Sequence, residues 1–256
     1  MARVDTGAKI RTKDEGGLFE TVKVIIQALL IALVVRTLLF QPFNIPSGSL
    51  VPTLLVGDYL FVSKYSYGYS KHSMPFSPPL FEGRIWASEP QRGDIAVFKL
   101  PKDNSTDYIK RVIGLPGDKV QVIDGVLQIN GKPVLRKRVE DYRTTDPYGR
   151  PVNVPQYEET LPNGVTHRII ERDGDQGYWD NTNVYTVPPN HFFMMGDNRD
   201  NSTDSRDEAS VGYVPFENFV GRAEIIFFSI DEGSSAWRIW EWPWSVRWGR
   251  ILTPIR

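Results

Sequence analysis

The chain has 256 residues, of which 41% are hydrophobic and 24% charged, shares close to those of an average globular protein. Its 30 Lys and Arg residues nearly balance its 31 Asp and Glu residues, so it lacks the excess positive charge typical of a nucleic-acid-binding protein and we expect no nucleic-acid partner. It has no cysteine, and its histidines (His72, His167, His191) are scattered, so we expect no cysteine nucleophile, disulfide, metal site or cofactor.

The only segment apolar enough to enter a bilayer runs from residue 18 to residue 40. Its most apolar part, residues 24–35, is short enough to be a buried core helix or the apolar region of a signal peptide. The longer stretch reaches a spanning length, with Lys23 and Arg36 near its ends, where long side chains can extend to the membrane surface. No small residues suited to signal-peptide cleavage follow it. We therefore predict an uncleaved transmembrane anchor at residues 18–40.

Positive charge lies on one side of this segment only. Residues 37–63 contain no Lys or Arg, whereas the stretch before the anchor carries Arg3, Lys9, Arg11 and Lys13. Cytoplasmic flanks of membrane helices are enriched in Lys and Arg. The pattern therefore predicts a cytoplasmic tail at residues 1–17 and a translocated domain at residues 41–256.

The translocated part alternates short β-rich runs with turns of Gly, Pro and Asp. Residues 119–123 and 126–129 flank Asp124-Gly125, and Asn130-Gly131 follows, two pairs that tolerate the positive φ angles of tight hairpins. We expect further strands at residues 58–63, 94–98, 108–113 and 223–228. The fold class predicted is mainly β: an N-terminal transmembrane helix followed by a β-sheet catalytic domain with a small β insertion.

Two regions of the translocated part differ from the rest in composition. Residues from about 132 to 189 are polar and weakly periodic, and we interpret them as an accessory β insertion that carries no chemistry. Residues 237–256 are rich in Trp and Arg, which suits contact with lipid headgroups, while a packing segment or a protein-binding surface is an equally good interpretation. Pro243 makes one long helix there improbable. The aromatic and basic residues concerned are Trp237, Trp240, Trp242, Trp244, Trp248, Arg238, Arg247 and Arg250.

Three polar motifs could carry chemistry. The loop Pro46-Ser47-Gly48-Ser49-Leu50 could place a hydroxyl beside backbone N–H groups, although most such sequences are turns. In a strand at 108–113, Tyr108 and Lys110 would share one face, and burial would lower the pKa of that lysine, although a lysine at a strand rim is the simpler interpretation. Residues 196–206 form a polar loop that lacks the Gly and distal Glu of a calcium-binding EF-hand.

Together these motifs resemble the type I signal peptidase family of serine-lysine proteases. The matching blocks are residues 40–58, 93–98, 108–118 and 196–206, in the order of the family and directly after an N-terminal anchor. The resemblance implies a serine endopeptidase that cuts secretory preproteins after Ala-x-Ala sites. It also implies a monomer in the bacterial cytoplasmic membrane, in contact with membrane lipid, with its catalytic domain on the outer, periplasmic side.

The resemblance also implies roles for individual residues. Ser49 matches the nucleophile and Lys110 its general base, while the Ser47 hydroxyl and the Ser49 backbone N–H match the oxyanion hole. Ser202 matches a hydroxyl that orients the lysine. An ion-pair framework is expected from Asp204, Arg206, Asp197 and Arg111. The residues that match the substrate groove are Phe43, Ile45, Pro46, Leu50, Leu54, Tyr108 and Ile109.

The predicted dyad sets a physical requirement on Lys110. A free lysine has a pKa of about 10.4 and is almost fully protonated at pH 7, so burial must lower that pKa for the amine to act as a base. Lowering the pKa of the lysine by three units would cost roughly 4 kcal/mol of free energy relative to a lysine in water. We therefore expect apolar neighbours around Lys110 rather than an adjacent carboxylate. Shallow apolar pockets walled by Ile45, Leu50 and Ile109 would suit alanine in the substrate.

Two other functions are considered. A cytosolic self-cleaving repressor uses a similar Ser-Lys dyad on a related β-fold, but it would need a DNA-binding domain where this chain has an apolar helix. A non-catalytic, membrane-tethered binding protein would use the polar loops only to stabilise its fold. Such a protein would be indifferent to substitution of Ser49 or Lys110.

Overall fold

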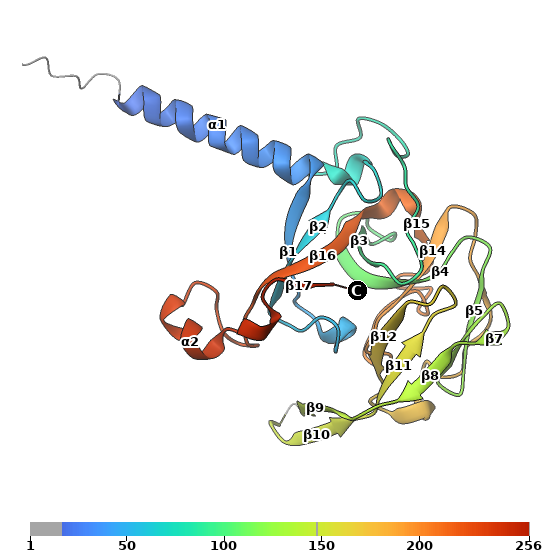
Figure 1. Cartoon of the computed structure of the whole chain (residues 1–256). Helices are drawn as coiled ribbons and strands as arrows, with labels where there is room; N and C mark the ends of the chain where they lie inside the picture. Colours follow the sequence, from blue (N-terminus) through green and yellow to red (C-terminus); the bar gives the residue numbers. More distant parts are fainter. Residues whose placement is uncertain (1–16, 147, 256) are drawn as a thin grey trace, which may run out of the picture.

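The computed structural model describes residues 17–146 and 148–255. Figure 1 shows one long helix that leads away from a body built of β-sheets. The elements are α1 (Gly17–Leu38), β1 (Phe40–Asn44), β2 (Asp58–Ser63), β3 (Ile95–Lys99), β4 (Asp107–Gly114), β5 (Lys119–Ile123), β6 (Val126–Ile129), β7 (Lys132–Pro133), β8 (Leu135–Arg138), β9 (Tyr142–Thr145), β10 (Pro151–Val154), β11 (Gln156–Thr160), β12 (Thr166–Ile170), β13 (Tyr185–Thr186), β14 (His191–Met195), β15 (Val214–Pro215), β16 (Phe219–Ser229), α2 (Trp242–Ser245) and β17 (Thr253–Pro254). The fold is mainly β, as the sequence predicts.

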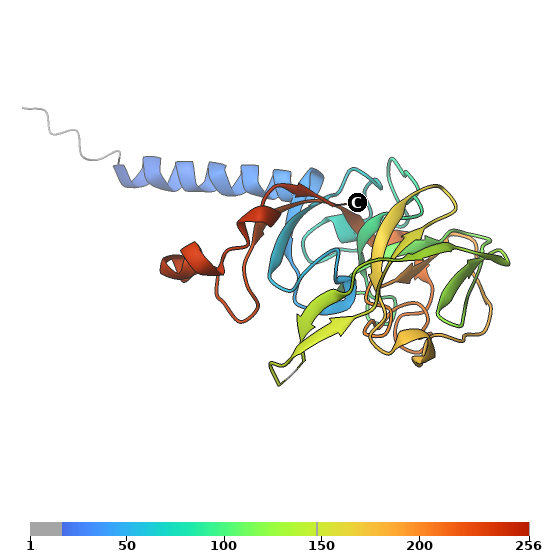
Figure 2. The same cartoon turned by 60° about the horizontal axis from the view of Figure 1, so that its bottom comes forward.

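Helix α1 is long and apolar enough to cross a membrane over residues 19–38, and none of that stretch is buried in the rest of the protein. Figures 1 and 2 both show it projecting from the β body rather than packing on it. The alternative of a buried core helix is therefore wrong. Phe40, expected as the end of the anchor, is instead the first residue of β1. The basic residues of the predicted cytoplasmic tail, from Arg3 to Lys13, lie outside the described residues.

The main sheet contains or borders the polar motifs found in the sequence. Its strands run in the order β1-β2-β16-β3-β4-β14-β15, with β17 paired to β16. All of these neighbours are antiparallel, and β16 is long enough, at 11 residues, to pair with both β2 and β3. Strand β1 contains Pro42, which has no N–H to donate and is tolerated because β1 is an edge strand. The order brings residues 40–44, 107–114 and 191–195 into one sheet.

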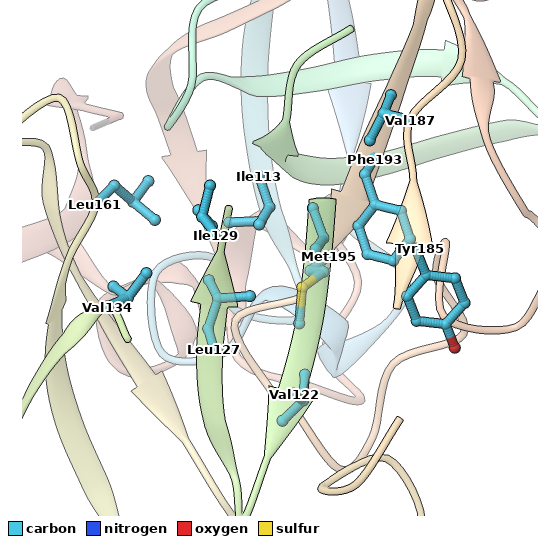
Figure 3. Close-up of a cluster of buried hydrophobic side chains, with 11 residues drawn as sticks. Ile113, Val122, Leu127, Ile129, Val134, Leu161, Tyr185, Val187, Phe193 and Met195 are labelled. Atoms are coloured by element: carbon cyan, nitrogen blue, oxygen red, sulfur yellow. The ribbon is translucent and has the colours of Figure 1, made fainter. Parts of the chain in front are cut away.

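The second half of the body is built of smaller sheets. Strands β5, β6, β7 and β13 form a four-stranded sheet, β8, β11 and β12 a three-stranded sheet, and β9 and β10 a hairpin. The predicted turns are present, with positive φ at Asp124, Gly125, Asn130 and Gly131. The region from about 132 to 189 is thus β, as expected. A buried apolar cluster that includes Ile113 from β4 and Leu127 from β6 joins this half to the main sheet (Figure 3).

In the C-terminal stretch the indole rings are exposed, whereas the arginine side chains have partners within the protein. Trp237, Trp240, Trp244 and Trp248 expose more than half of their surface. The arginines, by contrast, have partners within the protein: Arg238 pairs with Glu241, Arg250 pairs with Asp58, and Arg247 donates to the carbonyls of Val56 and Ile230. Arg247 and Arg250 are thus held within the protein, while contact of this stretch with lipid headgroups stays a prediction. Pro243 lies at the start of α2, which has only four residues.

Candidate active site

The loop that carries Ser49 is fixed at both ends by the main sheet. After β1, the Ile45 N–H donates to the Asp58 carbonyl, and residues Gly48–Leu50 form one turn of 3-10 helix. Leu50 is 1% exposed and packs in the core, which holds the backbone of its neighbour in place. Ser49 itself is 7% exposed, so its hydroxyl lies at the base of a cleft rather than in open solvent.

Lys110 reaches this hydroxyl from β4. The register of β4 on β3 sets Lys110 opposite Ala96, and its Nζ lies 2.6 Å from the Ser49 Oγ. The side chain is buried, and the Tyr108 ring, on the same face of the strand, lies 5.5 Å from the Nζ. Among residues 17–146 and 148–255, no carboxylate forms an ion pair with Lys110. The nearby Asp197 and Asp204 carboxylates pair with arginines instead, and the expectation of apolar neighbours around Lys110 stays a prediction.

Burial is the main influence on the charge of Lys110. It lowers the pKa of this lysine from 10.5 to about 8, against the opposing effect of the Asp204 and Asp197 carboxylates. A pKa of about 8 leaves roughly a tenth of the amine neutral at pH 7. A neutral amine 2.6 Å from a hydroxyl can accept its proton directly, which is the geometry of a nucleophile and its base.

The loop at residues 196–206 holds the serine loop in place. The Asn198 backbone N–H donates to the Ser49 carbonyl, and its side-chain amide donates to the Gly48 carbonyl. Gly196 is required for this close approach, because a Cβ there would lie 2.5 Å from the Ser49 carbonyl oxygen and 2.3 Å from the Ser202 Oγ. Asn198 was not among the predicted site residues. Nothing in its local sequence indicates that it contacts a loop 150 residues away.

The two hydroxyls that were expected to assist the dyad differ in their surroundings. The Ser47 Oγ lies 3.5 Å from the Ser49 Oγ, and Ser47 is exposed to the cleft. The Ser202 Oγ is buried and has no hydrogen-bond partner within the described residues. The structure thus brings Ser202 to the site but shows no direct bond from its hydroxyl to Lys110. The orienting role of Ser202 stays a prediction.

The four charged residues of the expected framework form two buried ion pairs. Arg111 binds Asp197 through two parallel hydrogen bonds, of 2.8 and 2.7 Å, and Arg206 binds Asp204 through two of 2.9 Å. Bidentate pairs of this kind fix orientation as well as neutralise charge. Thr53, close to the serine loop, adds a 2.6 Å hydrogen bond to Asp197. The Arg111–Asp197 pair connects β4, which carries Lys110, to the loop at residues 196–206, and the Arg206–Asp204 pair braces that loop internally.

A third buried pair was missed by the sequence analysis. Arg199 binds Glu159 of β11 through both carboxylate oxygens, and the His167 Nε2 lies 3.4 Å from the same carboxylate. Burial alone would raise the pKa of Glu159, but Arg199 and His167 outweigh it and hold that pKa well below its usual range. This pair ties the insertion to the loop beside the dyad.

A cleft of about 540 Å³ opens over the dyad. Its lining comprises Pro46, Ser47, Gly48, Ser49, Asp107, Tyr108, Ile109, Lys110, Trp179, Asp200, Asn201, Ser202 and Thr203. Trp179 belongs to the insertion, which therefore helps to shape the cleft, while the expectation that the insertion carries no chemistry stays a prediction.

Three of the predicted groove residues are covered by the protein itself. Ile45, Leu50 and Leu54 are at most 3% exposed and belong to the core cluster beneath the serine loop, because they pack against strands of the main sheet. Phe43 and Ile109 are partly buried and pack against the same cluster. Of the predicted groove residues, Pro46, Tyr108 and Ile109 line the cleft directly. The others support its walls from below.

Comparison with known proteins gives consistent results. Residues 18–228 match the family model described as signal peptidase, peptidase S26. The chain is similar to the signal peptidase I of Rickettsia typhi, with 48% identity over 210 residues that cover 78% of this chain and 76% of that protein. It is 44% identical over 242 residues to the signal peptidase I of Rickettsia akari, covering 87% of each chain. A crystal structure of a signal peptidase I from Enterococcus faecalis is 27% identical, with a TM-score of 0.32, and covers 53% of this chain and 97% of that one.

Proposed function

This chain belongs to the signal peptidase family, peptidase S26, and we propose that it is a serine endopeptidase that releases signal peptides from exported preproteins, with Ser49 as nucleophile and Lys110 as general base. The observation that carries the proposal is the 2.6 Å contact between the Ser49 Oγ and the buried Lys110 Nζ. A lysine whose pKa is lowered to about 8 supports it, because only a neutral amine can accept a proton.

The reaction follows from the positions of these groups. Neutral Lys110 takes the proton of the Ser49 hydroxyl as its oxygen attacks the carbonyl carbon of the scissile bond. The negative charge that develops on the substrate oxygen is stabilised by the Ser47 hydroxyl and the Ser49 N–H. The Lys110 ammonium then gives its proton to the leaving amine as the C–N bond breaks. Water, deprotonated by Lys110, hydrolyses the acyl-enzyme and restores Ser49.

Specificity for small residues follows from the shape of the cleft. An extended peptide that pairs with a strand edge presents alternate side chains to the protein. Ile109 and Pro46 line the cleft beside the dyad, and the neighbouring side chains of Ile45 and Leu50 are buried in an apolar core cluster. Such a surface suits alanine at the first and third positions before the cut. We propose Ala-x-Ala as the cleavage signal on these grounds.

The test is cleavage of a purified preprotein whose signal peptide ends in Ala-x-Ala. We expect the wild-type protein to cut after the second alanine and Ser49→Ala to lose about 10³-fold or more in kcat/KM, because the variant lacks the hydroxyl that lies 2.6 Å from the Lys110 Nζ. A preprotein with Trp for the second alanine serves as the substrate control and should resist cleavage. A non-catalytic binding protein would show equal processing by wild type and Ser49→Ala, and that result would refute the assignment.

The apolar helix and the family together fit a membrane-anchored enzyme. We propose that α1 crosses the cytoplasmic membrane with its N-terminus inside, and that residues 41–256 lie on the outer side. Protease added to intact spheroplasts should then digest the domain, and full protection would contradict this orientation.

Figures 1 and 2 show α1 and the stretch around α2 on the same side of the body. We therefore propose that the exposed indoles from Trp237 to Trp248 touch the same membrane.

Tryptophan fluorescence can test the lipid contact, because α1 contains no tryptophan. In vesicles with brominated acyl chains, we expect strong quenching of the wild-type emission and a loss of most of that quenching when Trp237, Trp240, Trp244 and Trp248 are all replaced by Ser. Trp179, which lies in the insertion and lines the cleft, provides the control as Trp179→Ser. Equal quenching of the fourfold variant and the wild type would show that the indoles face water or protein.

A further inference from the structure

Three carboxylates from two parts of the chain meet beside the catalytic cleft. Glu171, which follows β12, and Asp180 lie in the insertion, and Asp200 lies in the loop at residues 196–206. One oxygen of each lies within 4.8 Å of the others. Glu171 and Asp180 are each only 1% exposed. Since burying like charges together is unfavourable without a compensating cation, the cluster requires an explanation.

The neighbouring groups leave some carboxylate oxygens of the cluster without hydrogen bonds and do not neutralise its negative charge. The Glu171 Oε2 and the Asp200 Oδ1 are buried and have no hydrogen-bond partner in the described part of the chain. The nearest ion pair is with Arg136, whose NH1 lies 3.6 Å from the Glu171 Oε1, and Arg136 also binds Asp175 at 2.9 Å. One guanidinium shared with a fourth carboxylate cannot neutralise three others. Arg199 and Arg206 act on the cluster only at longer range.

The backbone is shaped around the cluster. The Gly177 N–H donates to the Asp180 Oδ2, and the Asp173 N–H donates to the Asp200 Oδ2 at 2.8 Å. A Cβ at Gly177 would lie 2.5 Å from the Asp200 Oδ1 and 3.2 Å from the Asp180 Oδ2, so glycine allows the chain to pass directly over the carboxylates. These contacts orient one oxygen of Asp180 and one of Asp200 and leave further acceptor positions for a ligand.

We propose that Glu171, Asp180 and Asp200 bind a divalent cation of the size of Ca²⁺. Calcium binds carboxylate oxygens at about 2.3–2.6 Å, so oxygens on opposite sides of one ion lie up to about 5.2 Å apart, whereas magnesium, at about 2.0–2.1 Å, requires a tighter group. The three carboxylate oxygens lie within the limit for the larger ion. The site departs from the sequence expectation of no metal, and it does not depend on the proposed peptidase activity.

Protonation is the competing explanation for the cluster. Burial, with Asp200 and Asp180 nearby, raises the pKa of Glu171 to about 8, so in the absence of a cation this carboxyl holds a proton at pH 7. Binding of the cation would release that proton.

A bound cation would tether the insertion to the loop next to the dyad. Asp200 is two residues from Ser202 and four from Asp204, and it also lines the cleft. Glu171 and Asp180 lie outside that loop. The cation would thus act on the position of Ser202 without touching the substrate.

Terbium luminescence and thermal unfolding test the site in the full-length protein. Trp179, the neighbour of Asp180, can transfer excitation to a bound Tb³⁺ ion. After treatment with a chelator, we expect saturable Tb³⁺ emission that Ca²⁺ displaces. Ca²⁺ at about a hundred times its dissociation constant should raise Tm by about 5–10 °C. Glu171→Gln and Asp200→Asn should each weaken Ca²⁺ binding about tenfold or more.

The control is Asp175→Asn, which removes a nearby carboxylate that is 44% exposed in its side chain and lies outside the cluster. It should keep Ca²⁺ affinity within about threefold of wild type. Absence of Ca²⁺-dependent emission and of any change in Tm would overturn the proposal and leave the cluster as a protonated carboxyl group. An equal loss of affinity in Asp175→Asn and Glu171→Gln would overturn it as well, because it would show diffuse attraction by surface acids.

Discussion

Replacement of Lys110 by methionine is expected to lower kcat/KM for a preprotein by about 10³-fold or more. Methionine has a similar length and suits an apolar environment, so the variant should fold, but it has no nitrogen to take the proton of Ser49. The measurement is steady-state cleavage of an Ala-x-Ala preprotein, with circular dichroism to confirm the fold. Lys110→Arg should be equally inactive, because a guanidinium stays protonated in proteins.

Lys64 offers a matched control for this experiment. It is also a buried lysine whose pKa burial lowers to about 8, but its Nζ donates to the Ser73 carbonyl at 3.1 Å. Lys64→Met removes a buried amine of the same kind at another place, so it should cost stability but keep kcat/KM within a few-fold. Equal activity of Lys64→Met and Lys110→Met would mean that the base has been wrongly assigned.

The pH dependence of cleavage is a second test of Lys110 as the general base, because it reports the pKa of the group that accepts the proton. Only neutral Lys110 can act, and its pKa is about 8, so kcat/KM should rise about tenfold per pH unit below 8 and level off above it. The residual activity of Lys110→Met should lack this slope. Between pH 8 and about 10.5 the folded protein binds fewer protons than the unfolded chain at this site, so the lysine also makes stability rise with pH there.

The parts of the fold that were predicted correctly are indicated by residues that lie close together in the sequence. The hairpins at Asp124-Gly125 and Asn130-Gly131 follow from residues that tolerate positive φ, and all four adopt it. The shared face of Tyr108 and Lys110 follows from the two-residue period of a strand. The pairing of Lys110 with Ser49, by contrast, came from resemblance to a family, because residues 61 positions apart share no local pattern.

The parts that were missed depend on contacts distant in sequence. Strand β1 contains Pro42 and no alternation, and it is a strand because β2 pairs with it along its whole length. Strand β14 is a continuous apolar run, which periodicity cannot distinguish from a buried helix. The Glu159–Arg199 pair joins residues 40 apart, and each of them has other charged residues closer in sequence. The choice of partner is made by the tertiary fold.

The buried ion pairs bear directly on the state of Lys110. Asp197 and Asp204 both raise the pKa of Lys110, and Arg206 lowers it, so these charges oppose the burial that makes the amine neutral. Each carboxylate is bound by an arginine through two hydrogen bonds, which offsets its charge and fixes it away from the lysine. The framework therefore has two physical effects, on the rigidity of the loop and on the protonation of the base.

Removal of one member of this framework is expected to be the most destabilising single change. Asp197→Ala takes away the carboxylate that binds the fully buried Arg111 guanidinium, and breaking such a pair costs about 3–5 kcal/mol. For a domain of this size, Tm should fall by on the order of 10 °C. The measurement is thermal unfolding in detergent, together with urea denaturation to compare the midpoints.

An ion pair on the surface serves as the control, because it tests whether burial causes the large loss of stability expected for Asp197→Ala. Glu140 pairs with Arg168 at 3.2 Å, and their side chains are 72% and 51% exposed, so Glu140→Ala should change stability by about 1 kcal/mol or less. The double variant Arg111→Met with Asp197→Leu should recover much of the lost stability, because it removes both buried charges together. If Asp197→Ala proved no more costly than Glu140→Ala, the loop beside the dyad would have to be held by its other contacts, chiefly the hydrogen bonds of Asn198 to the serine loop.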